Sequence, residues 1–180
     1  MGGIVDLNDY RIQRAVSKGF GPWRTRFGKD YGAATRLADL CDHTIQSLAQ
    51  PGDQSTEAFY ELIMGCLDLG NLHKFGELDN ATRMQVVEIH LFLADQVRFE
   101  MMRRLGWVRP FDCGRHPLVA IILKHAELRT CGSHPPELHE GHPQHAAYAA
   151  LDRRDREAFI RRLLRAALES FARAISPAPG

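Results

Sequence analysis

The sequence predicts an all-α fold, a single-domain bundle of five to seven helices around a long central helix at about residues 80–105. Apolar residues recur with helical spacing through nearly the whole chain, and no segment shows the alternation of apolar and polar residues that marks a strand. The length of 180 residues suits one domain, and 44% hydrophobic with 25% charged residues is typical of a globular protein.

The first 29 residues are expected to form an N-terminal helix and an aromatic, basic linker. The helix should cover residues 7–16, and the linker begins with several helix breakers at 19–23. We expect Phe20 and Trp23 to be buried as a clamp on the bundle; stacking on nucleic-acid bases and contact with a membrane surface are the alternatives.

The bundle domain is expected to span residues 30–175, and residues 176–180 should form a disordered tail. The central helix is apolar almost all round, so neighbours should cover most of its circumference, and Gly106 should end it. Asp152, with Asp155 three residues later, should cap the last helix. The other helices are expected at about 30–49, from Ser55 to Leu69, at 118–129 and at 153–175.

A pentapeptide with the pattern Cys-Gly-x-His-Pro occurs twice, at residues 113–117 and 131–135. Zinc needs four ligands around one point, and two Cys-x-x-His units supply the right atoms. A helix over residues 118–129 would span about 18 Å and hold the two units apart. The repeated pentapeptide therefore has two main interpretations: a zinc site, or Gly and Pro that mark helix ends with Cys and His beside them by chance. Two separate metal sites, or sites completed by a partner, stay open. The candidate ligands here are Cys113, His116, Cys131 and His134.

Residues 131–145 are rich in Pro, Gly and His and are expected to form an irregular loop. His139 and His142 complete the set of candidate metal ligands, because imidazole binds zinc, nickel and copper. A pH-sensitive surface loop is a second interpretation, since several imidazoles titrate near neutrality. Exposed histidines without a special role are the third.

Two carboxylates lie on one face of the central helix, since Glu88 and Asp95 are seven residues apart. On an otherwise apolar face they should be paired or have raised pKa values. Arg98 is three residues from Asp95 and is its expected partner. His90 projects from another side. These four residues form a candidate buried polar site, and a structural ion pair or a partly exposed strip is the alternative.

The net charge is +1, which gives no reason to expect nucleic acid as a partner. Residues 53–100 nevertheless hold nine acidic and three basic residues, whereas residues 150–180 hold seven arginines and four acidic residues. We expect basic terminal helices to pack against an acidic middle; a basic surface for an anionic partner is the alternative. The chain has no membrane-length apolar run, no visible signal peptide and few cysteines, which favours a cytoplasmic protein.

No nucleotide-binding glycine loop, nucleophile elbow or Cys-His catalytic signature is present. The first hypothesis is therefore a non-enzymatic helical protein that acts through protein–protein contacts, with a homodimer through the amphipathic last helix as one form. The alternative is a metal-binding helical protein that uses the Cys-x-x-His units and the histidine loop. A third hypothesis is nucleic-acid binding by the basic termini. No cofactor is expected, apart from zinc in the alternative.

Overall fold

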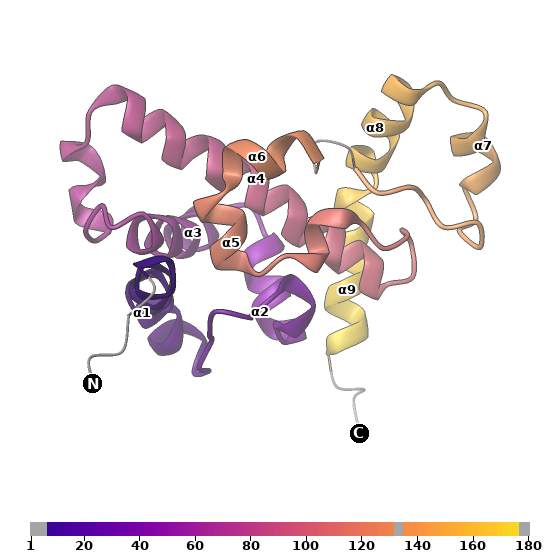
Figure 1. Ribbon diagram of the computed structural model, residues 1–180. Coiled ribbons are helices and arrows are strands. Elements are labelled where there is room, and N and C mark those ends of the chain that lie inside the picture. Colours follow the sequence, from indigo (N-terminus) through magenta and orange to yellow (C-terminus); the bar gives the residue numbers. More distant parts are fainter. Residues whose placement is uncertain (1–6, 132–134, 177–180) are drawn as a thin grey trace.

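The computed structural model of the chain describes residues 7–131 and 135–176 (Figure 1). In these two ranges the fold is all-α, with two isolated β-bridges and no strand. The central helix α4, Asn80–Arg104, confirms the predicted segment. Asp79 caps it by accepting a hydrogen bond from the Thr82 N–H at 3.0 Å, and Gly106 follows it with a φ of 73°. All but Ser176 of the expected tail lies outside the described residues.

Helix α1 packs along α3, α2 and α3 pack against α4, and α9 packs against both α2 and α4. In Figure 1, α7 and α8 lie on the opposite side of the molecule from α1. The other helices are α1 Leu7–Phe27, α2 Asp42–Ala49, α3 Asp53–Cys66, α5 Leu118–Leu123, α6 His125–Cys131, α7 His145–Ala149, α8 Arg153–Arg162 and α9 Leu164–Ile175. Short 3₁₀ turns are η1 Leu37–Asp39, η2 Leu72–Glu77 and η3 Asp112–Arg115.

The predicted linker at residues 19–23 is wrong, because α1 continues through it to Phe27. Close helix packing explains Gly19. A Cβ atom on Gly19 would lie 2.5 Å from the Cys66 Sγ atom of α3, so only glycine fits this crossing. The expected aromatic clamp is confirmed: Phe20 and Trp23 are buried, and the Trp23 Nε1–H donates to the Ala58 carbonyl at 2.7 Å.

The predicted helix at 30–49 is wrong in its first half, since only α2, Asp42–Ala49, forms there. The preceding chain pairs elsewhere: Arg36 and Pro117 form a β-bridge, and the Leu118 N–H donates to the Thr35 carbonyl at 2.8 Å. These tertiary hydrogen bonds replace the helical ones. Leu37 and Leu40 are buried all the same.

The two later predicted helices are each divided. The segment 118–129 forms α5 and α6, which are separated at Lys124 with φ −115° and ψ 25°. The segment 153–175 forms α8 and α9, which meet at Leu163. Asp152 caps α8 as predicted, because its side chain accepts from the Asp155 N–H at 2.9 Å. Residues 135–144 have no helix, which agrees with the predicted loop.

Basic residues near both ends of the chain pair with acidic residues of the middle, and this confirms the expected packing. Such ion pairs neutralise charges that would otherwise form a one-signed surface. The pairs are Arg14 and Lys18 with Asp68, Arg26 with Glu57 and Glu61, and Arg161 with Asp95.

Candidate functional site

The first Cys-x-x-His unit lies in a well-packed part of the fold. Cys113 belongs to η3 and is buried, and this burial raises the pKa of its thiol to about 12. The His116 N–H ends the turn by donating to the Cys113 carbonyl at 3.1 Å. Because zinc binds the thiolate, a metal site here would have to ionise Cys113 against the effect of burial.

The second unit cannot be placed, since the Cys131 side chain and His134 lie outside the described residues. The division of the intervening segment into α5 and α6 removes the single rod that was expected to hold the units apart. Within the described residues, no group of three or more His, Cys, Asp or Glu side chains is arranged to hold a metal ion. Zinc binding stays a prediction, and metal analysis of untagged protein and of a Cys113→Ser, Cys131→Ser variant tests it.

The histidines of the loop are part of its turns. The Nδ1 atom of His139 accepts from the Gly141 N–H at 3.1 Å, and that of His142 accepts from the Gln144 N–H at 3.2 Å. An accepting Nδ1 leaves the proton of the neutral ring on Nε2, so neither nitrogen offers a free lone pair. Metal binding by His139 or His142 would therefore have to break a turn.

The candidate polar site of α4 is not one site. Glu88 is 53% exposed and lies 3.7 Å from Arg129 of α6. Asp95 is half-buried and pairs with Arg98 at 3.6 Å, as expected, and with Arg161 of α8 at 2.6 Å. The structure therefore brings Asp95 and Arg98 together and leaves Glu88 apart in a separate ion pair.

Two histidines lie at the first half of α4, His90 in the helix itself and His125 in the neighbouring α6. His90 packs against the rings of Phe59 and Tyr60, at centroid distances of 5.4 and 5.2 Å. His125 of α6 is buried against Phe92 at 5.3 Å, and its Nε2 atom has no hydrogen-bond partner among the described residues. Burial lowers the pKa of both rings; the charge of Arg98 lowers it further at His90, and that of Arg129 does so at His125.

The buried charge of α4 is at Glu100, a residue that the sequence analysis did not select. Glu100 is 2% exposed and accepts from two arginines of its own helix. Arg103 donates through Nε at 2.7 Å and through Nη2 at 2.8 Å, and Arg104 donates through Nε at 2.9 Å. A useful signal was the spacing of a glutamate followed by arginines three and four residues later, which favours such pairs on a helix.

Arg104 connects this ion pair to the chain before α2. Its Nη2 group donates to the carbonyls of Leu37 and Leu40 at 3.0 and 2.8 Å, and its Nη1 group donates to Asp42 at 2.6 Å. The planar guanidinium can hold several acceptors at once. The hydrogen bonds of Arg104 thus join α4 to residues 37–42 within the chain, which indicates a structural role for this network.

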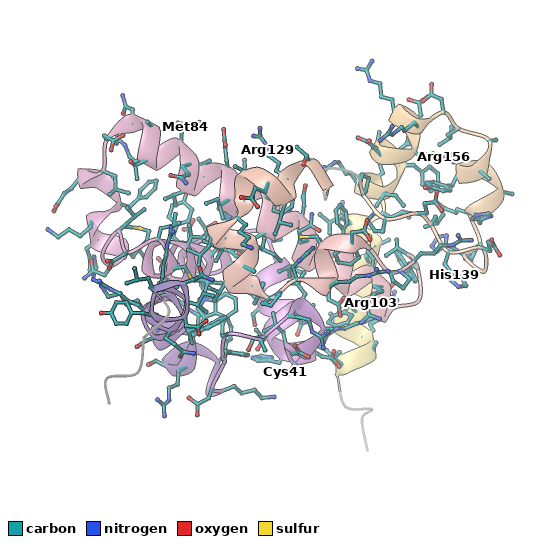
Figure 2. All side chains as sticks on the ribbon, in the orientation of Figure 1. Cys41, Met84, Arg103, Arg129, His139 and Arg156 are labelled. Atoms are coloured by element: carbon teal, nitrogen blue, oxygen red, sulfur yellow. The ribbon has the colours of Figure 1, made fainter. Side chains whose placement is uncertain are left out.

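An exposed apolar surface lies on the first half of α4; Leu7 and Tyr10 of α1 are exposed as well. We call Met84, Glu88 and Leu91, together with Arg129 of α6, the α4 strip. Met84 is 57% exposed and Leu91 is 60% exposed, although the helix is otherwise central. Met84 and Arg129 lie along the same upper edge of the molecule in Figure 2. The expectation that neighbours cover α4 on most sides is therefore wrong for this part.

The same row of side chains is covered further along the helix. Asp95, Arg98 and Met102 continue the spacing of four and three residues that relates Met84, Glu88 and Leu91, so all six fall on one face. Met102 is only 1% exposed, and α9 packs on α4 while Arg161 of α8 pairs with Asp95. The chain thus covers this face beyond Leu91.

The face of α9 that was expected to mediate a homodimer is used within the chain. Ala167 and Phe171 are buried, and α9 packs against α2 and α4. This face of α9 is therefore already covered, whereas Met84 and Leu91 of the α4 strip are exposed.

A cavity of about 470 Å³ lies between the end of α1, α2 and the start of α3. Its volume suits a small ligand. Part of its polar lining is occupied by internal contacts, however. Arg26 pairs with Glu61 at 3.0 Å, the Ser47 hydroxyl donates to the His43 carbonyl at 2.9 Å, and that of Ser55 donates to the Gln50 carbonyl. We therefore assign no ligand to it.

No protein-family model, curated protein sequence or solved structure matches this chain. Among the described residues, no helix has the length and apolar character needed to cross a membrane. The α4 strip is therefore interpreted from its own geometry.

Proposed function

We propose that this protein is a non-enzymatic helical module that acts through protein–protein contacts, and that the α4 strip is the contact surface. The observation that carries the proposal is the exposure of Met84 and Leu91, one heptad apart on the central helix. Large apolar side chains that line up on one helix face are typical of contacts with another protein.

The chemistry of the strip defines the partner surface. Two apolar side chains about 10.5 Å apart along a helix fit a second helix that offers apolar groups at the same spacing. Between them stand one acidic and one basic side chain, Glu88 and Arg129, 3.7 Å apart. We therefore propose an amphipathic helix of mixed charge as the partner, rather than nucleic acid or a membrane.

A cytoplasmic location is part of the proposal. The described cysteines Cys41, Cys66 and Cys113 are free thiols, and burial raises the pKa values of Cys66 and Cys113 to about 12. Free, buried thiols suit a reducing compartment.

A photo-crosslinking amino acid at position 91 tests the proposal in cells. We expect it to capture protein, because Leu91 would be covered by the partner. The matched control carries the same group at Arg165, an exposed position of α9 outside the strip. Capture from position 91 but not from 165 supports the proposal. Equal capture from both positions, or none from position 91, contradicts it.

A further inference from the structure

We infer that the occupant of the α4 strip is a second copy of this chain, bound through an antiparallel, two-fold pairing of the two α4 helices. The inference rests on the proposed function, because it identifies the partner of that same surface. Three features of the strip support it: its spacing, its charge and its continuation along the helix.

The spacing is self-complementary. Met84 and Leu91 are of similar size and lie at equal distances on either side of the middle of the strip, close to Glu88. A two-fold axis through that point places Met84 against the partner's Leu91, and Leu91 against the partner's Met84. An isologous interface requires such a patch, which must fit its own rotated copy.

The charges of the strip also fit a second copy. The axis gathers both Glu88 carboxylates and both Arg129 guanidinium groups, two charges of each sign around one point. Within one chain the two groups are 3.7 Å apart and both are more than half exposed, so their hydrogen-bonding capacity is available to the partner. A two-fold axis brings the two Glu88 carboxylates together, and without the arginines they would repel each other. With two charges of each sign, the centre of the interface has no net charge.

The continuation of the strip shows what kind of element this face accepts. Beyond Leu91 the same row of α4 is covered within the chain: Asp95 pairs with Arg161 of α8, Arg98 donates to the Ala49 carbonyl of α2 at 3.4 Å, and Met102 is buried. The exposed first half ends where this cover begins. A second α4 helix would cover the part of the row that its own chain leaves open.

Sedimentation equilibrium of untagged protein, from about 10 μM to 1 mM, measures the association, since small interfaces of this kind are weak and transient. We expect a monomer–dimer equilibrium in this range. Glu88→Arg should place four positive charges at the axis, and Arg129→Glu should place four negative charges there. Because these like charges repel, each variant alone should dimerise at least about tenfold more weakly than the wild type. An equal mixture of the two variants should regain wild-type association, because the mixed dimer has two charges of each sign.

Glu77→Arg and Arg165→Glu change the net charge by the same amounts at exposed positions outside the strip and serve as controls. Thermal unfolding by circular dichroism confirms that every variant is folded. A monomer at 1 mM overturns the inference, as does a dimer that Glu88→Arg and Arg129→Glu leave unchanged, or a mixture that stays monomeric. If the purified protein is monomeric while position 91 captures a different protein in cells, the second copy is wrong and the proposed function stands.

Discussion

The two halves of α4 each contain apolar residues and a glutamate with an arginine partner, but their surroundings differ. In the second half, Glu100 is 2% exposed and Met102 is 1% exposed, and Arg104 connects the helix to residues 37–42. In the first half, Glu88 and Met84 on the same helix are more than half exposed. The second half thus holds the fold together, whereas the first half carries the open surface.

The largest difference between the halves is expected for their glutamates. Glu100→Gln should lower the free energy of unfolding by about 3–5 kcal/mol, because Arg103 and Arg104 lose the buried carboxylate that they share and only Asp42 remains as an anionic partner of Arg104. Glu88→Gln should change it by less than about 1 kcal/mol, since its pair with Arg129 is exposed. Urea unfolding followed by circular dichroism measures both. Equal effects of the two substitutions would contradict the structural role of the Glu100 network.

Only part of this comparison could be predicted from the sequence. The start of α4 near Asn80, its end before Gly106 and the pair of Asp95 with Arg98 follow from local signals within a few residues of each site. The burial of Glu100 depends on carbonyls of Leu37 and Leu40, which belong to a distant segment. No local pattern contains that information.

The errors of the sequence analysis have the same cause. Gly19 and Pro22 usually end a helix, yet α1 passes through both, and at Gly19 it lies so close to α3 that no side chain would fit. The apolar character of α4 predicts a covered helix, but the sequence pattern of a helix does not tell how many other elements pack around it. Leu91 is exposed because the elements that cover Met102 do not extend that far.

The second prediction compares two methionines on the same row of α4. Met102→Ala should lower the free energy of unfolding by about 2–5 kcal/mol, because it leaves a cavity in the core. Met84→Ala should change it by less than about 0.5 kcal/mol in the monomer, since the side chain is mostly in water. Denaturant unfolding at low protein concentration, where any dimer is dissociated, measures both values. A large loss for Met84→Ala would show that this part of α4 is covered within the chain.

The smallest effect is expected from the histidines of the first half. The pKa values of His90 and His125 are lowered in the folded protein, chiefly by burial, so the unfolded chain binds protons first as the pH falls below the ordinary value of 6.5. The free energy of unfolding should therefore be highest above pH 7 and should decrease as the pH falls through 6.5 toward the lowered values. Denaturant unfolding between pH 5 and 7.5 measures this slope.

A matched pair of variants tests whether the pH dependence of the free energy of unfolding comes from the histidines at the first half of α4. Around His125 the nearby charges are Arg129, which opposes protonation, and Glu88, which favours it; burial outweighs both. His125→Phe keeps a ring against Phe92 and should reduce the pH dependence, although a part due to His142, whose pKa is also lowered by burial, should remain. His73→Gln, at an exposed position of η2, should leave it unchanged. If the His125→Phe, His90→Phe double variant keeps the full slope, the loss of stability must arise elsewhere, and the pH sensitivity would not separate the two halves of the helix.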